Sequence, residues 1–240
     1  MSFQPKPIYL LADSQLLFAR RNGKLVLDSI RSVVLATSPK AAYVGASNGD
    51  RPEFYSIFEA AMAGLNIVDC CMISSRLSDA DASSVMTADI ILLAGGDVSR
   101  GWRSFQETGL KDLIVDRYHQ GAVLIGVSAG AVQLGILGWP EEGFAGDKVI
   151  ELFQLVPCII SAHDEKMEWQ ELKSAVQMFG GKWPGIGLPT GGGAIYHPDR
   201  SLVPLQLPLH EFTMSGEGVS HAFLMPPSFQ SAKPEGEALP

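Results

Sequence analysis

The chain has 240 residues, 46% of them hydrophobic and 18% charged, which is enough apolar material for one large domain. A net charge of −8 gives no basic surface for nucleic acid or an anionic membrane, so neither is expected as a partner. No apolar stretch reaches the roughly 18 residues that span a bilayer. The N-terminus lacks a signal-peptide pattern and the three cysteines lack metal-binding spacing, so we expect a cytoplasmic protein without metal or cofactor.

Short apolar runs alternate with helical patterns along the first half of the chain. The predicted strands are 8–12, 41–46, 67–73, 90–94 and 123–127. The predicted helices are 15–20, 26–34, 51–65, 79–87, 102–119 and 129–135. This alternation indicates an α/β fold with a single-domain, doubly wound, mostly parallel sheet and helices on both faces. Cys70 and Cys71 fall in a predicted strand, which favours buried free thiols.

The pattern loosens after residue 135. The next segments are a loop at 139–146 and an apolar stretch at 149–155 whose conformation the sequence does not determine. They are followed by a short strand at 159–162 and an amphipathic helix at 165–179. From 185 to 225, short apolar runs alternate with Gly and Pro, which predicts a C-terminal antiparallel extension. We therefore expect one domain over residues 1–226 and a disordered tail over 227–240.

One segment, Gly126-Val-Ser-Ala-Gly130, lies between a predicted buried strand and a predicted helix. This pattern is typical of a nucleophile elbow, which would carry Ser128 on a sharp turn. Flanking glycines allow close approach of neighbouring backbone, and the following helix directs its free N–H groups toward a developing oxyanion. The alternative is a Gly-rich turn in which Ser128 only caps the helix.

A serine nucleophile needs a base, and five histidines are available. His163 follows a predicted strand directly, so it lies at the carboxyl end where doubly wound folds place their sites. Its alternative is a residue beside a helix N-cap. The others fit surface, turn or strand positions better, namely His119, His197, His210 and His221.

Gly95-Gly96-Asp97 also ends a predicted strand. Its backbone N–H groups could donate to an oxyanion or to a substrate carboxylate. The alternative is a tight turn in which Asp97 caps the next helix.

The carboxylate behind the base stays open at this point. The loop between the serine and the histidine offers Glu141, Glu142 and Asp147. Asp164 and Glu165 lie beside His163, although adjacent residues on a helix seldom face each other.

The order Gly-Gly-Asp, Gly-Val-Ser-Ala-Gly-Ala and Leu-Val-Pro…Ala-His resembles the dipeptidase E and cyanophycinase family of serine peptidases, from about residue 8 to 195. The resemblance implies a class I glutamine-amidotransferase-like fold. It also implies Ser128 as nucleophile, His163 as general base, and Gly96 with the N–H of Ala129 as oxyanion hole. The family's acid lies between the serine and the histidine or later, and Glu142 is marginally favoured over Glu141.

Relatives often follow the Gly-Ile-Gly strand with an acidic pair, but this chain has Pro189-Thr190 there. The His163 segment also continues Asp-Glu-Lys, where relatives tend to show an aromatic residue and arginine. Relatives cleave small acidic peptides, so the resemblance implies a small peptide or amide substrate, possibly Asp-containing. Arg100 and Arg103 are the candidate cations for such a substrate.

These features predict a serine peptidase that forms an acyl-enzyme on Ser128. The alternative is a non-catalytic binding protein on the same scaffold. An amidotransferase would need a cysteine at the elbow, where this chain has serine. The apolar late strands could pair with a second copy, so a homo-oligomer stays open.

Overall fold

A computed structural model describes residues 5–227, apart from residues 22, 141–142, 145–147 and 217. All but the first residue of the predicted tail 227–240 lies outside the described residues. None of the described helices combines the length and the apolar character that a bilayer span requires.

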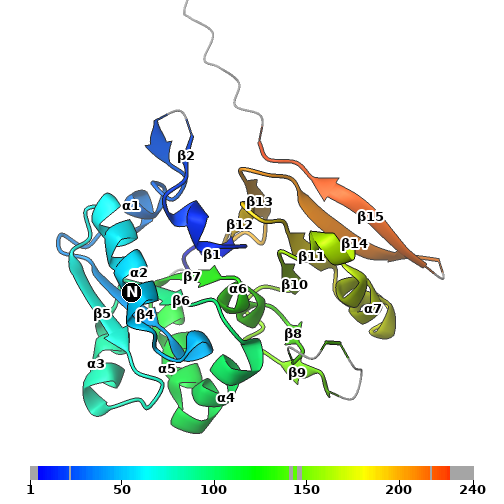
Figure 1. The fold of residues 1–240 in the computed structure, drawn as a ribbon. Coiled ribbons are helices and arrows are strands. Elements are labelled where there is room, and N and C mark those ends of the chain that lie inside the picture. Colours follow the sequence, from blue (N-terminus) through cyan, green and yellow to red (C-terminus); the bar gives the residue numbers. More distant parts are fainter. Residues whose placement is uncertain (1–4, 22, 141–142, 145–147, 217, 228–240) are drawn as a thin grey trace, which may run out of the picture.

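The centre of the molecule is a seven-stranded sheet in the order β13-β12-β1-β7-β6-β4-β5 (Figure 1). Strands β1, β7, β6, β4 and β5 are parallel, whereas β12 and β13 extend the sheet in antiparallel fashion. The seven strands are β1 (Ile8–Leu11), β4 (Lys40–Val44), β5 (Asp69–Ile73), β6 (Ile90–Leu93), β7 (Val123–Val127), β12 (Gly193–Tyr196) and β13 (Leu202–Leu205). The predicted doubly wound, mostly parallel sheet is confirmed.

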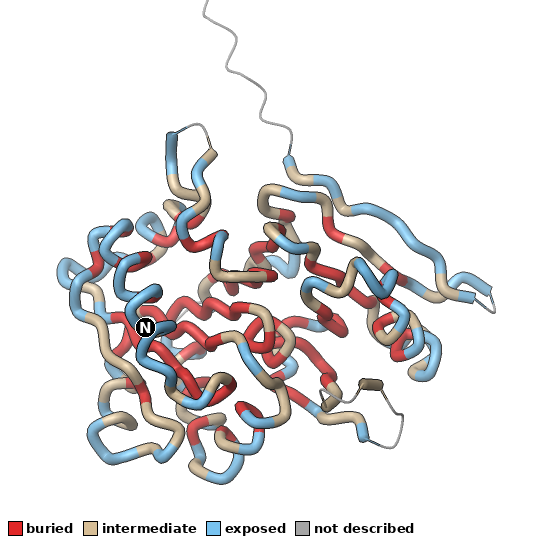
Figure 2. The backbone as a smooth tube through the Cα atoms, viewed as in Figure 1, coloured by how far each residue is buried: buried red, intermediate tan, exposed pale blue. Residues whose placement is uncertain are grey.

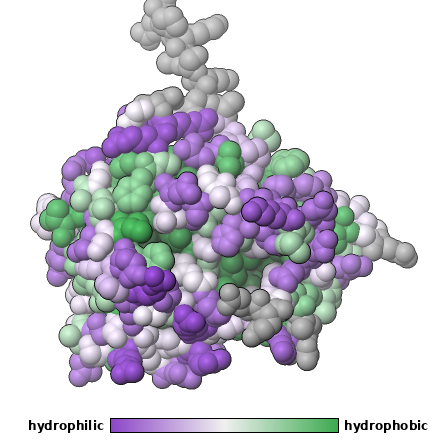
Figure 3. Space-filling view, viewed as in Figure 1, coloured by the Kyte–Doolittle hydropathy of each residue, from purple (hydrophilic) through white to green (hydrophobic). Residues whose placement is uncertain are grey.

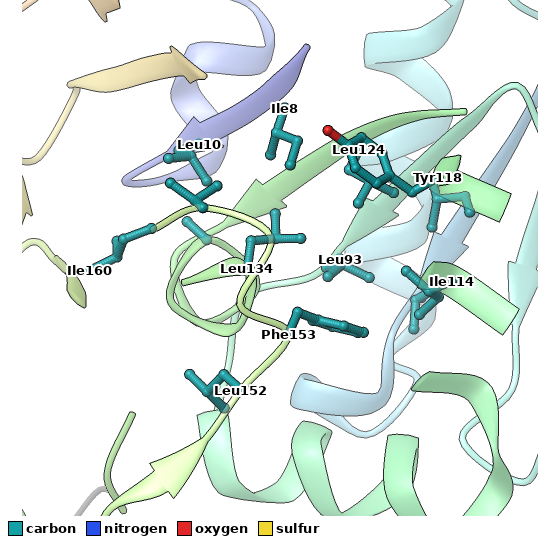
Figure 4. Packing of buried hydrophobic residues seen from close by; sticks show 14 of the residues in the cluster. Ile8, Leu10, Leu93, Ile114, Tyr118, Leu124, Leu134, Leu152, Phe153 and Ile160 are labelled. Carbon is teal, nitrogen blue, oxygen red and sulfur yellow. The ribbon is translucent and has the colours of Figure 1, made fainter. Parts of the chain in front are cut away.

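Both faces of this sheet are covered, because alternate strand residues point to opposite sides. Ile8 and Leu10 belong to the core that includes residues of α3, α4, α5 and α6, whereas Tyr9 and Leu11 belong to the core that includes residues of α1 and α2. Figure 4 shows side chains of β1, β6, β7, α5 and α6 meeting in the first of these cores, and Figure 2 shows buried residues along the central strands. The helices are α1 (Ile30–Val33), α2 (Pro52–Gly64), α3 (Asp79–Thr87), α4 (Val98–Thr108), α5 (Leu110–His119) and α6 (Ala129–Leu134).

A second sheet of four strands has the order β10-β11-β14-β15 and packs against α7 (Figure 1). Trp169, Leu172 and Phe212 belong to the core between them. The elements are β10 (Ile159–Ala162), β11 (Gly185–Leu188), β14 (Leu209–Ser215), β15 (Gly218–Leu224) and α7 (Gln170–Met178). Two short hairpins complete the strands, β2 (Arg20–Arg21) with β3 (Lys24–Leu25) and β8 (Leu137–Gly138) with β9 (Ile150–Glu151).

The late antiparallel strands are present, but they are divided between the two sheets and β11 runs parallel to β10. The prediction of a single helix over 102–119 is wrong. Gly109 adopts a left-handed conformation with φ 78° and separates α4 from α5. The helix predicted at 165–179 is also divided, because Glu168 and Trp169 are left-handed between the 3-10 turn Glu165–Met167 and α7.

The helices predicted at 15–20 and 26–34 are also shorter than expected, since only the 3-10 turn Ser14–Leu17 and the four-residue α1 form there. The three cysteines are free, but only Cys158 is buried. Cys70 and Cys71 are half-buried because β5 is the edge strand of the central sheet.

Candidate active site

Ser128 occupies the sharp turn between β7 and α6, with φ 50° and ψ −112°. A non-glycine residue adopts this backbone only at an energetic cost, and such strain is typical of nucleophile elbows. The turn is fixed from two sides. The Ser128 N–H donates to the Leu11 carbonyl at 2.8 Å, and the Ser128 carbonyl accepts from the Ala131 N–H at 2.9 Å.

The two glycines of the elbow are required by close backbone packing. A Cβ added at Gly126 would lie 2.6 Å from the Ala131 nitrogen. A Cβ added at Gly130 would lie 2.1 Å from the Leu93 carbonyl oxygen. Both distances are far below van der Waals contact, so only glycine fits either position without moving the backbone. This confirms the prediction from the sequence that the two glycines allow close approach of neighbouring backbone.

His163 lies at the carboxyl end of β10 and faces Ser128 across the gap between the two sheets. Its Nε2 is 2.7 Å from Ser128 Oγ, so the hydroxyl donates to Nε2 when Nδ1 carries the ring proton. The His163 backbone N–H donates to the Leu188 carbonyl at 2.8 Å, and φ is 47°. The structure therefore brings together the two residues that the sequence predicted as nucleophile and base.

The Gly95-Gly96 turn lies against the elbow. A Cβ at Gly95 would be 3.3 Å from Ser128 Cβ, and one at Gly96 would be 2.2 Å from the Ser47 carbonyl oxygen. Gly96 has φ 136°, and its N–H has no hydrogen-bond partner within the described ranges. Ala129 begins α6, so its N–H has no acceptor within that helix. Two backbone donors are thus free near the hydroxyl.

Asp97 is the N-cap of α4, and its Oδ1 accepts from the Arg100 backbone N–H at 2.5 Å. The capping alternative for Asp97 is therefore present in the structure. Asp97 and Arg100 both line the cavity beside Ser128, whereas Arg103 is not among the residues that line it.

The cavity has a volume of about 560 Å³ and reaches from the Ser128–His163 pair to the exposed face of α2. Its far end is apolar, and Phe54 and Ile57 there are 37% and 36% exposed. Figure 3 shows hydrophobic residues gathered over the α2 region, with hydrophilic residues around them. Leu17 and Phe58 also line the cavity.

Two arginines add positive charge to this cavity. Arg51 pairs with Glu53 and lies over the Phe54 ring, 5.1 Å from its centroid. Arg100 makes no ion pair with any residue in the described part of the chain. The cavity therefore combines an apolar wall with the guanidinium groups of Arg51 and Arg100 and the carboxylates of Asp13 and Asp97.

The favoured acid Glu142 and its alternatives Glu141 and Asp147 lie outside the described residues. Two carboxylates next to His163 are described. Burial raises the pKa of Asp164, and the nearby charge of Glu171 raises it further. Burial also acts on Glu165, but hydrogen bonds from Thr190 and the proximity of His163 outweigh it and lower its pKa.

The other four histidines do not line this cavity. His210 Nδ1 and His221 Nε2 are 3.1 Å apart on neighbouring strands β14 and β15. His119 ends α5, and His197 closes a turn through its N–H to the Ser201 carbonyl. Within the described ranges, no group of three or more His, Cys, Asp or Glu residues could hold a metal ion.

Comparisons with known proteins identify the family and support the fold. The family model described as peptidase family S51 matches residues 8–201. A crystal structure of a peptidase from an acI-B1 Actinobacterium superposes with a TM-score of 0.71 at 15% identity, covering 95% of this chain and 97% of that one. A protein assigned as a peptidase E from Listeria monocytogenes EGD-e gives a TM-score of 0.56 at 15% identity, covering 92% and 99%. No curated protein sequence matches the chain.

Proposed function

The chain belongs to peptidase family S51 and is a serine-type peptidase, and we propose that Ser128 and His163 are its nucleophile and general base. The observation that carries this proposal is the 2.7 Å contact between Ser128 Oγ and His163 Nε2 on a strained elbow. A hydroxyl gains nucleophilicity when a neutral imidazole within hydrogen-bond distance takes its proton.

The proposed reaction has two halves. Ser128 Oγ attacks the peptide carbonyl carbon while its proton passes to His163 Nε2. The resulting oxyanion accepts hydrogen bonds from the free N–H groups of Gly96 and Ala129, and loss of one such donor costs about 100- to 1,000-fold in kcat. His163 then protonates the leaving amine, which leaves an acyl-enzyme. Water, deprotonated by His163, hydrolyses the ester and restores Ser128.

The cavity supports a small peptide as substrate. Its volume of about 560 Å³ fits a few residues, not a folded protein. Arg100 supplies a cation near Ser128, and its freedom from ion pairs within the described residues favours a carboxylate on the substrate. The apolar wall formed by Phe54 and Ile57 would contact a hydrophobic side chain of the same peptide.

A fluorophosphonate probe tests the pair directly. We expect it to label Ser128 in the natural protein, and we expect Ser128→Ala to abolish labelling. His163→Ala should slow labelling by at least about 100-fold, the usual contribution of a general base. Labelling that survives in Ser128→Ala, or a folded natural protein that is not labelled, would contradict the proposal.

Dipeptide hydrolysis tests the substrate. Replacing Arg100 with Gln should lower kcat/KM for an Asp-containing dipeptide about tenfold, since a charge-assisted hydrogen bond is lost. Hydrolysis of an uncharged dipeptide should change little. Arg103→Gln is the matched control, because Arg103 lies on the same helix and does not line the cavity. Equal losses for the two substrates would exclude a carboxylate contact at Arg100.

A further inference from the structure

Gln133 is a fully buried polar residue of the elbow helix α6, whose other residues are small or apolar. A buried amide is costly unless hydrogen bonds replace its contacts with water. Gln133 Nε2 donates to the Val98 carbonyl and to Ser47 Oγ, both at 3.0 Å. A carbonyl only accepts, so the amide nitrogen must face Val98, which fixes the orientation of the side chain. Gln133 therefore joins α6 to two segments that are distant in sequence.

Ser47 forms the other half of this bridge and is 1% exposed. It lies in the 3-10 turn Ala46–Asn48, which follows β4. Its hydroxyl donates to Gln133 Oε1 at 3.4 Å, and its carbonyl accepts from the Asp97 N–H at 2.9 Å. Gly101 of α4 leaves room for the bridge, because a Cβ there would lie 2.1 Å from Ser47 Oγ and 2.5 Å from Gln133 Nε2. The Gln133–Ser47 bridge is thus enclosed between this turn, α4 and α6.

The bridge connects the two segments that carry the proposed oxyanion donors. Gly96 packs directly on the Ser47 peptide, since a Cβ at Gly96 would lie 2.2 Å from the Ser47 carbonyl oxygen. Val98, whose carbonyl binds Gln133, follows in the same segment as Gly96. At the other end, Gln133 lies about one helical turn beyond Ala129 in α6. One end of the bridge therefore holds the Gly96 turn, and the other end belongs to the helix that begins at Ala129.

We propose that Gln133 and Ser47 are positioning residues that set the separation of the Gly96 and Ala129 N–H groups. The inference rests on the proposed oxyanion site beside Ser128. These two N–H groups belong to different elements, so the geometry of one turn cannot fix their separation. Both must lie about 3 Å from the developing oxyanion to stabilise it, and a misplacement of about 1 Å costs about 100-fold in rate. Gln133 does not line the cavity, so it acts only through the backbone.

The polar character of the bridge supports this role. Two apolar side chains of the same shape would fill the space and leave no polar side-chain atom to satisfy there. Hydrogen bonds are directional, whereas apolar packing tolerates small shifts between elements. The Gln133 amide, held by Ser47 and Val98 at once, therefore favours a single placement of α4 relative to α6.

Gln133→Met is the first variant, because methionine has a similar length and no amide. The rate constant of fluorophosphonate labelling should fall about 100-fold, since the phosphoryl oxygen of the probe occupies the oxyanion site. For dipeptide hydrolysis, kcat should fall by a similar factor with KM changed by less than about threefold, because the two donors act mainly in the transition state. The pH midpoint of labelling should stay the same, since His163 is unchanged. Gln106→Met, on the exposed face of α4, is the matched control and should be labelled at the natural rate.

A double variant distinguishes positioning from stability. Gln133→Met leaves Ser47 Oγ buried without its side-chain partner, so the urea midpoint should fall. Adding Ser47→Ala removes that polar atom and should restore most of the midpoint. We expect labelling of the double variant to stay about 100-fold slow. Labelling that recovers together with the midpoint would show that the bridge only stabilises the fold, and would overturn the proposal.

Ser47→Ala alone keeps the bond from Gln133 to Val98 and should be labelled about tenfold more slowly. If Gln133→Met does not fold, Ser47→Ala and the double variant provide the same comparison of rate with stability. Natural labelling rates in both would then contradict the positioning role.

The outcomes separate this inference from the proposed function. A folded natural protein that is not labelled, or labelling that survives in Ser128→Ala, contradicts the proposed function itself. If labelling requires Ser128 but Gln133→Met is labelled at the natural rate, the nucleophile stands and the role of Gln133 is wrong. An increase in KM with unchanged kcat would also overturn the role, because Gln133 would then act on substrate binding.

Discussion

The turn that carries Ser128 and the turn that carries His163 lie at strand ends in different sheets, and they are held in different ways. The Ser128 turn is fixed by backbone packing, with a Cβ at Gly130 only 2.1 Å from the Leu93 carbonyl oxygen. The His163 turn is more exposed and is held by single hydrogen bonds, such as that from the His163 N–H to the Leu188 carbonyl. The proposed nucleophile is therefore positioned by close backbone packing in addition to hydrogen bonds. The proposed base is positioned by polar contacts such as the one to β11.

Gly130→Ala should give the largest effect, because the new methyl group meets a backbone carbonyl that cannot rotate away. We expect the free energy of unfolding to fall by about 3 kcal/mol and activity to be lost, as in severe overpacking. Urea denaturation measures the first and dipeptide hydrolysis the second. Gly218→Ala is the control, since nothing lies within 4 Å of its added Cβ. Equal stability of the two variants would show that packing does not fix the elbow.

This difference also decides what the sequence could predict. Gly126, Ser128 and Gly130 are adjacent in the chain, and their spacing follows from the local geometry of one strand-to-helix turn. That motif therefore predicted the sharp turn and the place of Ser128 on it. The turn that carries His163 is held by the hydrogen bonds of His163 to Leu188 and of Glu165 to Thr190, each across 25 residues, and no local pattern encodes those contacts.

His163→Asn should show the opposite behaviour, with lost activity and retained stability. The His163 backbone is left-handed with φ 47°, a conformation that Asn adopts more readily than most residues. We expect kcat/KM to fall about 1,000-fold, while the free energy of unfolding changes by less than about 1 kcal/mol. Kinetics and thermal unfolding of the same preparation check both expectations. A loss of stability as large as that of Gly130→Ala would show that the His163 turn is also fixed by packing.

Strain at the elbow predicts a smaller effect that does not involve activity. Ser128→Gly and Ser128→Ala both remove the hydroxyl, but glycine adopts φ 50°, ψ −112° without a Cβ clash. Release of strain outweighs the entropic cost of glycine, so Ser128→Gly should be about 1 kcal/mol more stable than Ser128→Ala. Chemical denaturation of the two variants measures the difference. If Ser128→Ala were the more stable protein, the turn would store no strain.

The sequence predicted the fold correctly where apolar runs alternate with helical patterns. The strands Ile90–Leu93 and Val123–Val127 lie in the middle of the sheet and are fully buried, so their residues are uniformly apolar. The break between α4 and α5 was missed because the helical pattern continues past Gly109, whose left-handed conformation ends α4. The division of the late strands between two sheets depends on pairing between distant segments, which periodicity does not report.

The smallest expected effect comes from the charge of Asp164. It is tested by the pH dependence of the free energy of unfolding. The pKa of Asp164 is raised above the ordinary 3.8, mainly by burial, so the folded state binds this proton more tightly than the unfolded state. The stability of the natural protein therefore decreases as pH rises through the interval above 3.8. Asp164→Asn carries no such proton, so it should be the more stable protein at pH 7.

The advantage of Asp164→Asn should vanish at acidic pH, where the natural carboxyl is protonated in both states. Unfolding free energies of the two proteins between pH 3 and pH 8, with Glu168→Gln alongside, measure this dependence. An advantage that increases toward acidic pH would mean that Asp164 gains stability from its charge. Asp164 would then be held by a favourable ionic contact, and the His163 turn would be stabilised by charge in a way that the Ser128 turn is not.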